Sequence, residues 1–389
     1  MRLIVIADDL TGGAEIAGIG WRFGMNVGLI VDNSPLWGDE TCQMLVVVTN
    51  TRSETKEKAI EITKQLATNF KVRFAKDDVR FFKKIDSAMR GYIIAETCET
   101  LKVFGFRKAL LIPQNPSKGR IIEDGRYLID GLPINKTPFR YDPEFPISSA
   151  DVCGKILIGS KLLKVSNTTD NGIMVAEASS KDDIKSQIEK ADEETLIVGG
   201  ADCFEEMIRR LGFVFSKSLD GQKRSTKEQD NIFLGLRHTL IVQGSTQSKP
   251  PPAGIPSTLM PDEVMHGAVC DKWKMDALKE YRLNDTLALT IKHDEIDSSL
   301  ATIVKSQMSS VTSFIIQECK PQTVIIEGGA TAFNIIKIMK WKSFCVTYEY
   351  APGIVAITPY PINDYSPTLI LKPGSYAWGD IRYTITNND

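Results

Sequence analysis

The first fifteen residues constrain the fold of this chain more than any other segment. An apolar run from Leu3 to Ala7 is followed directly by Asp8, Asp9 and Thr11, and then by a helix-like segment. Such a run is typical of a strand buried on both faces of a parallel sheet, and ligands of these sheets bind just outside the carboxyl ends of the strands. A carboxylate there could orient or deprotonate a substrate hydroxyl, or hold a metal ion. The alternative is that one of the two aspartates only caps the following helix.

The rest of the chain alternates between strand-like and helix-like segments, which predicts an α/β fold. The expected strands are Leu3–Ala7, Val27–Val31, Met44–Thr49, Val79–Lys83, Ala109–Pro113, Ile173–Ala176, Leu196–Val198, Thr239–Val242, Thr286–Thr290, Thr323–Ile326 and Leu369–Leu371. The expected helices are Thr55–Phe70, Ile93–Gly105, Lys181–Asp192, Phe204–Gly212, Ser298–Cys319 and Phe333–Trp341. We interpret the pattern as two domains, residues 1–215 and 231–389, each a largely parallel sheet flanked by helices. A polar, charged segment without an apolar stripe, residues 216–230, is the expected linker.

Composition narrows the choice of partners. The 389 residues carry a formal charge of −2 and 42% of them are hydrophobic, so the chain can bury large cores but offers no basic field for nucleic acid or an anionic membrane. No apolar run approaches the roughly 18 residues that a membrane span requires. The seven cysteines form no C-x-x-C pair and the three histidines are far apart, which disfavours a zinc site. We therefore expect a cytoplasmic protein with small-molecule partners.

A second polar loop follows the expected strand Val79–Lys83 and precedes a helix. It places Lys84, Asp86, Ser87 and Arg90 within a few residues of one another. Arginine can bind a carboxylate or phosphate in bidentate fashion and lysine acts as a point charge, so this loop suits a small acidic, hydroxylated ligand. The alternative is a local salt-bridge cluster with Ser87 as a helix cap.

A third loop leaves the expected strand Ala109–Pro113. Asn115, Lys118 and Arg120 of this loop could complete a pocket for a hydroxy acid, or they could belong to an ordinary prolyl turn with surface charges. The surrounding segment, residues 113–146, is rich in Pro, Gly and Asp, which predicts loops and short strands.

Glycine loops dominate the second half of the chain. The three loops, each placed after an expected strand, are Gly244-Ser245-Thr246, Gly328-Gly329-Ala330-Thr331 and Lys372-Pro373-Gly374-Ser375. Glycine allows the backbone to approach phosphates closely, and a helix N-terminus offers free N–H donors, so these loops indicate a nucleotide site. The chain has neither a Walker-type P-loop nor a G-x-G-x-x-G dinucleotide motif.

In this order, the motifs resemble the four-carbon acid sugar kinase family over nearly the whole chain. The matching pieces are Ala7-Asp8-Asp9-Leu10-Thr11-Gly12, Lys84-Ile85-Asp86-Ser87 with Arg90-Gly91, Gly119-Arg120, Asp124-Gly125, Thr137-Pro138-Phe139, Asp142-Pro143, Gly244-Ser245, Gly328-Gly329 with Thr331, and Lys372 with Gly374. The chain departs from the usual family pattern at Ala330, at Pro373 and in the stretch before Gly119. These departures favour a divergent subgroup with its own substrate.

The resemblance implies an N-terminal sugar-acid domain, a C-terminal ATP domain, and Mg²⁺-dependent transfer across an active-site cleft between the two. The acceptor would be the terminal hydroxyl of an acid such as 3-oxotetronate, threonate or erythronate. Asp9, with Asp8 second, would orient and deprotonate that hydroxyl, and Arg90 would bind the substrate carboxylate or the migrating phosphoryl group. Other substrate contacts would come from Thr11, Lys84, Asp86, Ser87, Asn115 and Arg120. The ATP contacts would be Ser245, Gly328, Gly329, Ala330, Thr331 and Gly374.

Two other functions remain open at this point. One is an oxidoreductase or isomerase of similar acids, against which the missing dinucleotide motif counts. The other is a sugar-acid or nucleotide sensor without turnover. No residue is assigned as a metal ligand, and a homodimer is compatible with everything above.

Overall fold

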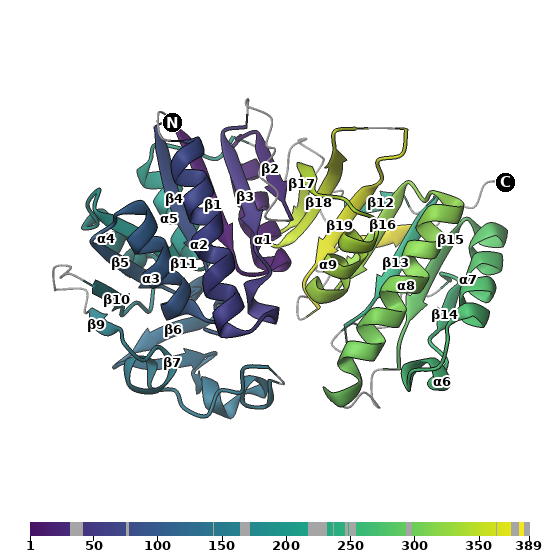
Figure 1. The fold of residues 1–389 in the computed structure, drawn as a ribbon, viewed down its shortest axis with the longest axis horizontal. Helices are drawn as coiled ribbons and strands as arrows, with labels where there is room; N and C mark the ends of the chain where they lie inside the picture. The colour runs from purple at the N-terminus through teal and green to yellow at the C-terminus, as the bar shows by residue number, and fades with distance from the viewer. Residues whose placement is uncertain are drawn as a thin grey trace, which may run out of the picture. The chain divides into compact units, whose positions relative to one another are not determined.

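The chain forms two compact units in a computed structural model, which describes residues 1–31, 42–74, 78–142, 144–163, 172–216, 232–235, 237–245, 248, 254–292, 298–362, 364–374 and 381–384. One unit comprises Met1–Val27 and Asp32–Phe215, and the other comprises Gly28–Val31 and Ser216–Asp389. The expected linker, apart from Ser216, lies outside the described residues. Each unit has a mostly parallel sheet flanked by helices, which confirms the expected fold class (Figure 1).

The first unit is built on a parallel sheet with the strand order β3-β1-β4-β11-β5-β10-β9. Its strands are β1 (Arg2–Ala7), β3 (Met44–Val48), β4 (Val79–Lys84), β5 (Lys108–Ile112), β9 (Lys161–Leu163), β10 (Gly172–Ala176) and β11 (Thr195–Gly199). Residues of the strands β1, β3 and β11 are buried nearly throughout. This is why their sequences read as continuous apolar runs and not as an alternation.

Helices of the first unit follow the strands in alternation. They are α1 (Leu10–Arg22), α2 (Lys56–Arg73), α3 (Ile93–Phe104), α4 (Lys181–Glu189) and α5 (Ala201–Arg210). Helix α2 packs against α3, and α5 packs against both α1 and α4. Their ends follow local rules: Thr55 caps α2, Ser180 and Asp183 form a capping box on α4, and Gly105 ends α3 in the left-handed conformation.

The register of the sheet brings three strand ends to one level. Ala7, the last residue of β1, pairs with Val48 of β3 on one side and with Lys84 of β4 on the other. The loops that leave these three strands therefore start side by side at the carboxyl edge of the sheet. This edge is where ligands of open α/β sheets bind.

Residues 113–142 form loops, short strands and 3₁₀ turns, as their composition predicts. A small antiparallel sheet comprises β6 (Arg120–Glu123), β7 (Arg126–Ile129) and β8 (Leu132–Pro133), and it is followed by the 3₁₀ turns Ile134–Lys136 and Pro138–Tyr141. Ile122, Tyr127 and Ile134 are fully buried in the same apolar cluster as Ile85. Because of this shared core, the segment is anchored beside the loop that leaves β4.

The second unit is a sheet in the order β14-β15-β13-β16-β19-β18-β17-β2. Its elements are β2 (Val27–Ile30), β13 (Thr239–Gln243), β14 (Ser257–Leu259), α6 (Asp262–Met265), α7 (Asp271–Asn284), β15 (Thr286–Thr290), α8 (Ala301–Cys319), β16 (Thr323–Glu327), α9 (Gly329–Ile338), β17 (Ser343–Ala351), β18 (Ile354–Tyr360) and β19 (Thr368–Lys372). The strands β14, β15, β13, β16 and β19 run parallel, while β18, β17 and β2 continue the sheet in antiparallel pairs. A separate parallel pair is β12 (Ile232–Gly235) and β20 (Ile381–Thr384).

Several features of the second unit differ from the expectation. The hairpin β17–β18 and the helix α7 were not among the expected elements. Helix α7 is mostly polar, and only its stripe of Trp273, Ala277, Leu278 and Tyr281 is buried. Residues 28–31, which the sequence places in the N-terminal domain, belong by their contacts to the second unit.

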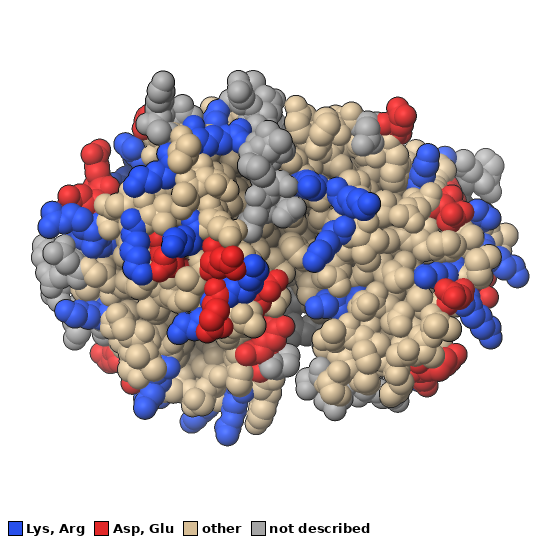
Figure 2. Space-filling view, viewed as in Figure 1, with Lys and Arg blue, Asp and Glu red and all other residues tan. Residues whose placement is uncertain are grey.

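The surface carries both signs of charge. Lys and Arg side chains are interspersed with Asp and Glu over the face in view (Figure 2), in keeping with the formal charge of −2. All seven cysteines are free, so none forms a disulfide. Among the helices of the described residues, none is both long enough and apolar enough to cross a bilayer.

Candidate active site

The turn between β1 and α1 presents Asp9 to the carboxyl edge of the first sheet. Asp9 is the N-cap of α1: its Oδ1 accepts a hydrogen bond from the Gly12 amide at 3.0 Å, and its Oδ2 accepts one from Thr11 Oγ1 at 2.5 Å. The capping alternative is therefore correct for Asp9. It is not the whole role, because the same carboxylate also pairs with Arg52 at 3.1 Å and its side chain keeps 18% exposure. Asp8 is buried and does not cap the helix.

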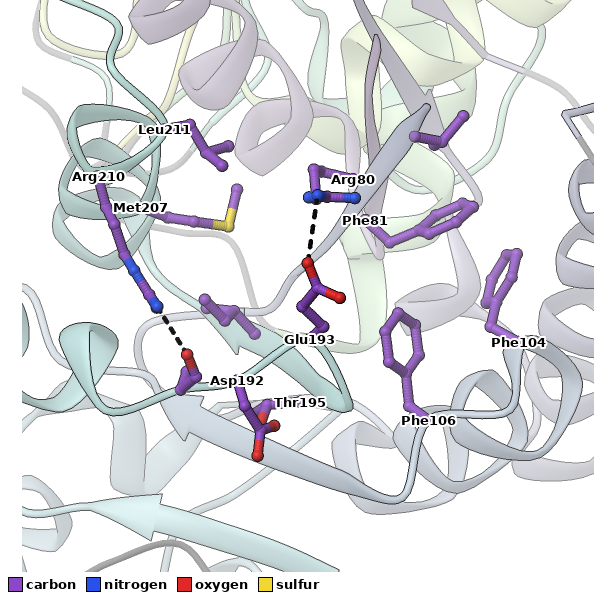
Figure 3. Close-up of a pocket in the computed structure, with 13 residues that line it drawn as sticks. Arg80, Phe81, Phe104, Phe106, Asp192, Glu193, Thr195, Met207, Arg210 and Leu211 are labelled. Atoms are coloured by element: carbon purple, nitrogen blue, oxygen red, sulfur yellow. Dashed lines mark hydrogen bonds and ion pairs between the residues drawn. The ribbon is translucent and has the colours of Figure 1, made fainter. Parts of the chain in front are cut away.

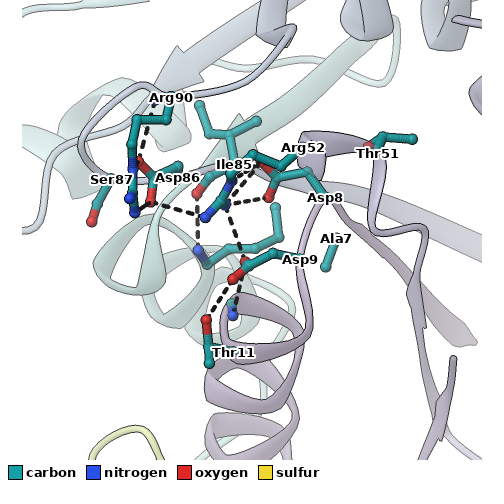
Figure 4. Close-up of polar contacts among 12 residues, drawn as sticks. Ala7, Asp8, Asp9, Thr11, Thr51, Arg52, Ile85, Asp86, Ser87 and Arg90 are labelled. Carbon is teal, nitrogen blue, oxygen red and sulfur yellow. Dashed lines mark hydrogen bonds and ion pairs between the residues drawn. The ribbon is translucent and has the colours of Figure 1, made fainter. Parts of the chain in front are cut away.

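Arg52, which was not among the expected site residues, is the centre of the site. It lies in the 3₁₀ turn Thr51–Ser53 that follows β3. Its Nε and Nη2 donate to both oxygens of Asp8 at 2.8–3.0 Å, Nη2 also donates to Asp9, and Nη1 lies 3.6 Å from Asp86 (Figure 4). A signal was present, since Arg52 lies just beyond the carboxyl end of a strand, as Asp8 does. No motif or glycine marked it.

The three carboxylates around Arg52 titrate differently. Burial raises the pKa of Asp8 to about 6, and the Arg52 charge only partly opposes this effect. Burial also acts on Asp9 and Asp86, but there the cations prevail: Arg52 and Lys84 hold the pKa of Asp9 below its usual value, and Arg52 and Arg90 hold that of Asp86 well below. At neutral pH, Asp9 and Asp86 are therefore fully ionised.

Lys84 lies at the end of β4, against the first turn of α1. It is 3% exposed, its Nζ donates to the Ile85 carbonyl at 2.9 Å, and Glu15 lies 3.8 Å away. A Cβ on Gly12 would lie 3.0 Å from this Nζ and 2.6 Å from Asp9 Oδ1. Glycine at this position therefore lets Lys84 and Asp9 share the helix N-terminus.

The loop after Lys84 is closed by Asp86 and Arg90. Asp86 accepts hydrogen bonds from the Arg90 amide at 3.2 Å and from its guanidinium at 2.8 and 3.0 Å, so the salt-bridge alternative is observed for this pair. The suggestion that Ser87 caps a helix is wrong, because α3 begins at Ile93 with Tyr92 as its N-cap. A helix start six residues later frees Ser87 for another contact.

That contact is made with Arg120, beside an aromatic platform. Arg120 Nη1 donates to Ser87 Oγ. The guanidinium carbons of Arg90 and Arg120 lie 5.4 and 5.6 Å from the ring centre of Phe139, at cation–π distance. Arg90 also donates to Asp142 at 3.0 Å and keeps 27% side-chain exposure. Phe139 and Asp142 thus hold the two cations that the sequence assigns to the substrate.

Asn115 is fully buried, and its side-chain oxygen accepts a hydrogen bond from the Asp202 amide at 3.0 Å, at the start of α5. The same loop is held by Ser117, which donates to Asp202, and by Lys118, which donates to Glu15 at 2.6 Å. The loop is thereby tied to α5 and α1, and the Asn115 oxygen serves this anchoring.

In the second unit, the glycine loops follow the adjacent strands β13, β16 and β19. Gly328 has φ of 108°, in a region that favours glycine, and it is the N-cap of α9. It carries no side chain to cap the helix, and the first turn, with Gly329, Ala330 and Thr331, holds no acidic residue. This helix start suits an anion. Gly244 and Ser245 lie beside it, whereas Thr246 and Ser375 are outside the described residues.

A separate hollow of about 590 Å³ lies at the opposite edge of the first sheet, near the beginnings of β4 and β11 (Figure 3). Phe81, Phe104 and Phe106 form its apolar wall, and Arg80 faces Glu193 across it at 3.9 Å. None of the residues expected at the site lines this hollow. The charged cluster at the carboxyl edge, and not this hollow, is therefore the candidate active site.

A known protein family matches the first half of the chain. The model of a family described as a sugar-binding N-terminal domain matches residues 3–198, which include the whole of the Arg52 cluster. The chain belongs to this family, the N-terminal domain of four-carbon acid sugar kinases. The family assignment expected from the motifs is thus confirmed.

Curated relatives of this family match part of the chain. Salmonella typhimurium D-threonate kinase is 29% identical over 166 residues, which are 42% of this chain and 38% of that protein. Heliobacterium modesticaldum D-erythronate kinase is 27% identical over 165 residues, 41% and 36% of the two chains. Brucella melitensis 3-oxo-tetronate kinase is 28% identical over 159 residues, 39% and 35%. The matched segments span less than two fifths of these relatives.

Solved structures share the fold over the whole chain. A Salmonella typhimurium LT2 structure, provisionally described as a tRNA synthase, aligns with a TM-score of 0.73 at 15% identity and covers 97% of this chain and 96% of its own. A Haemophilus influenzae protein of the DUF1537 family aligns with a TM-score of 0.65 at 16% identity, covering 97% of both chains. At these identities the likeness concerns the fold alone.

Proposed function

We propose that this protein is a kinase that transfers the γ-phosphoryl group of ATP to a hydroxyl of a small sugar acid with four carbons. Family membership and the names of the curated relatives support this reading. The observation that carries it is the position of Asp9, an ionised and partly exposed carboxylate surrounded by Arg52 and Lys84 at the carboxyl edge of the first sheet.

The first unit would hold the acid. Arg90 and Arg120, stacked on Phe139, present guanidinium groups suited to a carboxylate, and Ser87 in the loop from β4 accepts a hydrogen bond from Arg120. Asp9 would accept a hydrogen bond from the acceptor hydroxyl and orient it. Because phosphoryl transfer depends mostly on positioning and on neutralising charge, a carboxylate of lowered pKa suits this orienting role.

The second unit would hold the nucleotide. The uncapped first turn of α9 and the glycines around it offer backbone N–H donors to phosphates. Mg²⁺ usually reaches kinases on the phosphates of the nucleotide, held by one or two carboxylates at most.

In the transfer itself, the hydroxyl oxygen of the acid forms a bond to the γ-phosphorus, and the bond from that phosphorus to the β–γ bridging oxygen breaks to release ADP. The hydroxyl proton passes to Asp9. Lys84, next to Asp9 and the first turn of α1, would balance the negative charge that gathers on the transferring group.

Substitution of Asp9 by Asn tests the proposal while keeping the helix cap, because Asn caps a helix about as well as Asp. We expect Asp9→Asn to lower acid-dependent ADP release by about 10²-fold or more, the usual contribution of a positioned acid–base group. Asp151→Asn is the matched control, since Asp151 caps the turn Val152–Ile156 of the same unit by accepting from Gly154 at 3.0 Å.

The control should keep wild-type activity. Full activity of Asp9→Asn would show that Asp9 neither orients the hydroxyl nor accepts its proton. If the wild type binds both ligands but releases no ADP with any four-carbon acid, the chain is a sensor and the kinase proposal is wrong.

A further inference from the structure

Three buried polar residues stand directly before the three glycine loops of the second unit. Gln243 ends β13, Glu327 ends β16 and Lys372 ends β19, and all three are at most 2% exposed. The register places Gln243 beside Glu327 and Glu327 beside Lys372. Lys372 Nζ donates to Glu327 Oε2 at 2.9 Å, and Gln243 Nε2 donates to Glu327 Oε1 at 3.1 Å. One carboxylate thus links the ends of three neighbouring strands.

The backbone repeats this link one residue further on. The Gly244 amide donates to the Glu327 carbonyl at 3.2 Å, and the Gly328 amide donates to the Lys372 carbonyl at 3.1 Å. Lys372 Nζ also lies 3.5 Å from the Pro373 carbonyl, within its own loop. Each loop therefore starts from a residue fixed to the neighbouring loop.

The loops themselves are packed too closely for side chains. A Cβ on Gly374 would collide with Ser245 Oγ, and a Cβ on Gly244 would collide with the side chain of Thr331. Thr331 lies in the first turn of α9, so the contacts connect all three loops with the helix start. A small shift of one strand end would therefore move the three loops and the start of α9 together.

Burying an ion pair is a costly way to stabilise a fold, because apolar residues of similar volume often do as well or better. A pair placed under three converging loops therefore points to a purpose other than stability. We propose that the Gln243–Glu327–Lys372 cluster positions the three loops for the phosphates of the nucleotide, with Glu327 as the link and without direct contact to the ligand. This inference rests on the proposed function, in which the second unit binds ATP.

Equilibrium binding of ATP to the full chain tests the inference. The variants are Glu327→Gln, which removes the charge of the link, and Lys372→Arg, which keeps the pair. We expect Glu327→Gln to weaken ATP binding by about tenfold or more, since misplaced binding groups cost at least that much. Lys372→Arg should retain most of the affinity. In turnover, the loss should appear in the KM for ATP and not in the KM for the acid.

Glu96→Gln is a matched control in the first unit. Glu96 pairs with Lys83 at 2.6 Å, and both side chains are 1% exposed, so this pair is as buried as the pair of Lys372 and Glu327. The control should lower the melting temperature comparably and leave the dissociation constant of ATP unchanged. If Glu327→Gln does not fold, Gln243→Met removes one hydrogen bond of the same cluster at similar volume, and it should still weaken ATP binding.

The outcomes separate the two proposals. If the wild type binds no ATP, the proposed function fails at its nucleotide side. If the wild type binds ATP and a folded Glu327→Gln or Gln243→Met protein binds it equally well, the positioning role is wrong while the proposed function stands. Weaker ATP binding by Glu96→Gln of the same size would also overturn it, because a general loss of stability would then explain the effect.

Discussion

Substitution of Arg52 by Met should destabilise the first unit in a pH-dependent way. Arg52 contacts three carboxylates, and its side chain is only 11% exposed. Breaking a buried ion pair on one side costs about 3–5 kcal/mol. The total should stay near this single-pair value, because Asp86 keeps Arg90 and Asp9 keeps its cap contacts and nearby Lys84. Asp9 loses one hydrogen bond from Arg52, whereas Asp8 loses the guanidinium that binds both of its oxygens.

The sign of the pH dependence follows from Asp8. Burial already raises its pKa to about 6 in the presence of Arg52, and loss of the cation raises it further. A carboxyl group with a folded-state pKa above its unfolded value contributes stability below the unfolded pKa, and this contribution is lost as pH rises through the folded pKa. The loss in free energy of unfolding of Arg52→Met, relative to the wild type, should therefore be largest above about pH 7. It should shrink to about 1–2 kcal/mol near pH 5, where the variant lacks mainly hydrogen bonds.

Urea unfolding followed by circular dichroism, at about pH 7.5 and about pH 5, measures both quantities. Arg107→Met is the matched control, since Arg107 pairs with Glu194 at 3.4 Å but is 62% exposed. Its effect on the free energy of unfolding should stay within about 0.5 kcal/mol at either pH. Equal stability of Arg52→Met and wild type at neutral pH, or a deficit that grows on acidification, would refute this reasoning.

Three further predictions concern catalysis. Burial raises the pKa of Asp8 to about 6, and the ionised carboxylate holds Arg52 in place, so kcat/KM for the sugar acid should fall as pH drops through about 6. If an Asp8→Asn variant shows the same fall in kcat/KM at low pH, Asp8 is not the group that titrates. Phe139→Leu removes two cation–π contacts worth about 0.5–1 kcal/mol each, so KM for the sugar acid should rise several-fold. A rise in KM for ATP instead would show that Phe139 does not position the arginines for the acid. Gly374→Ala drives a Cβ into Ser245 Oγ and should weaken ATP binding on the order of tenfold by isothermal titration, whereas unchanged affinity would show that the loops are not interlocked.

The sequence predicts the parts of the site that local rules control. Asp8, Asp9, Lys84 and Asp86 were found because they lie at or just beyond the carboxyl ends of two expected strands, and a parallel sheet collects such ends at one edge. Arg52 escaped notice because it lies four residues beyond β3, in a 3₁₀ turn without a glycine or a motif. Asp9 both caps α1 and pairs with Arg52, and the second contact comes from a distant segment, so it could not be predicted from the sequence of the first turn alone.

Non-local pairing explains the errors in the fold. Strand β2 was correctly expected as a strand, but its partner β17 lies in the distant C-terminal half, with Ile30 opposite Ser343. Nothing in the local sequence of β2 indicates that partner. Helix α7 carries a buried stripe at helical spacing, yet its other positions are charged or polar and mask the pattern. Local periodicity therefore identifies segments better than it assigns them to a sheet.

The most direct test of the account follows the phosphoryl group itself. The full chain is incubated with ATP labelled at the γ-phosphorus and with each of a panel of tetronic and 3-oxotetronic acids, and the products are separated and identified by mass spectrometry. We predict that the label appears as a phosphate ester on at least one acid, in equal amount to the ADP formed, and that Asp9→Asn lowers its rate of formation by about 10²-fold or more. Label recovered only in ATP or inorganic phosphate, for every acid of the panel, would contradict the proposed function.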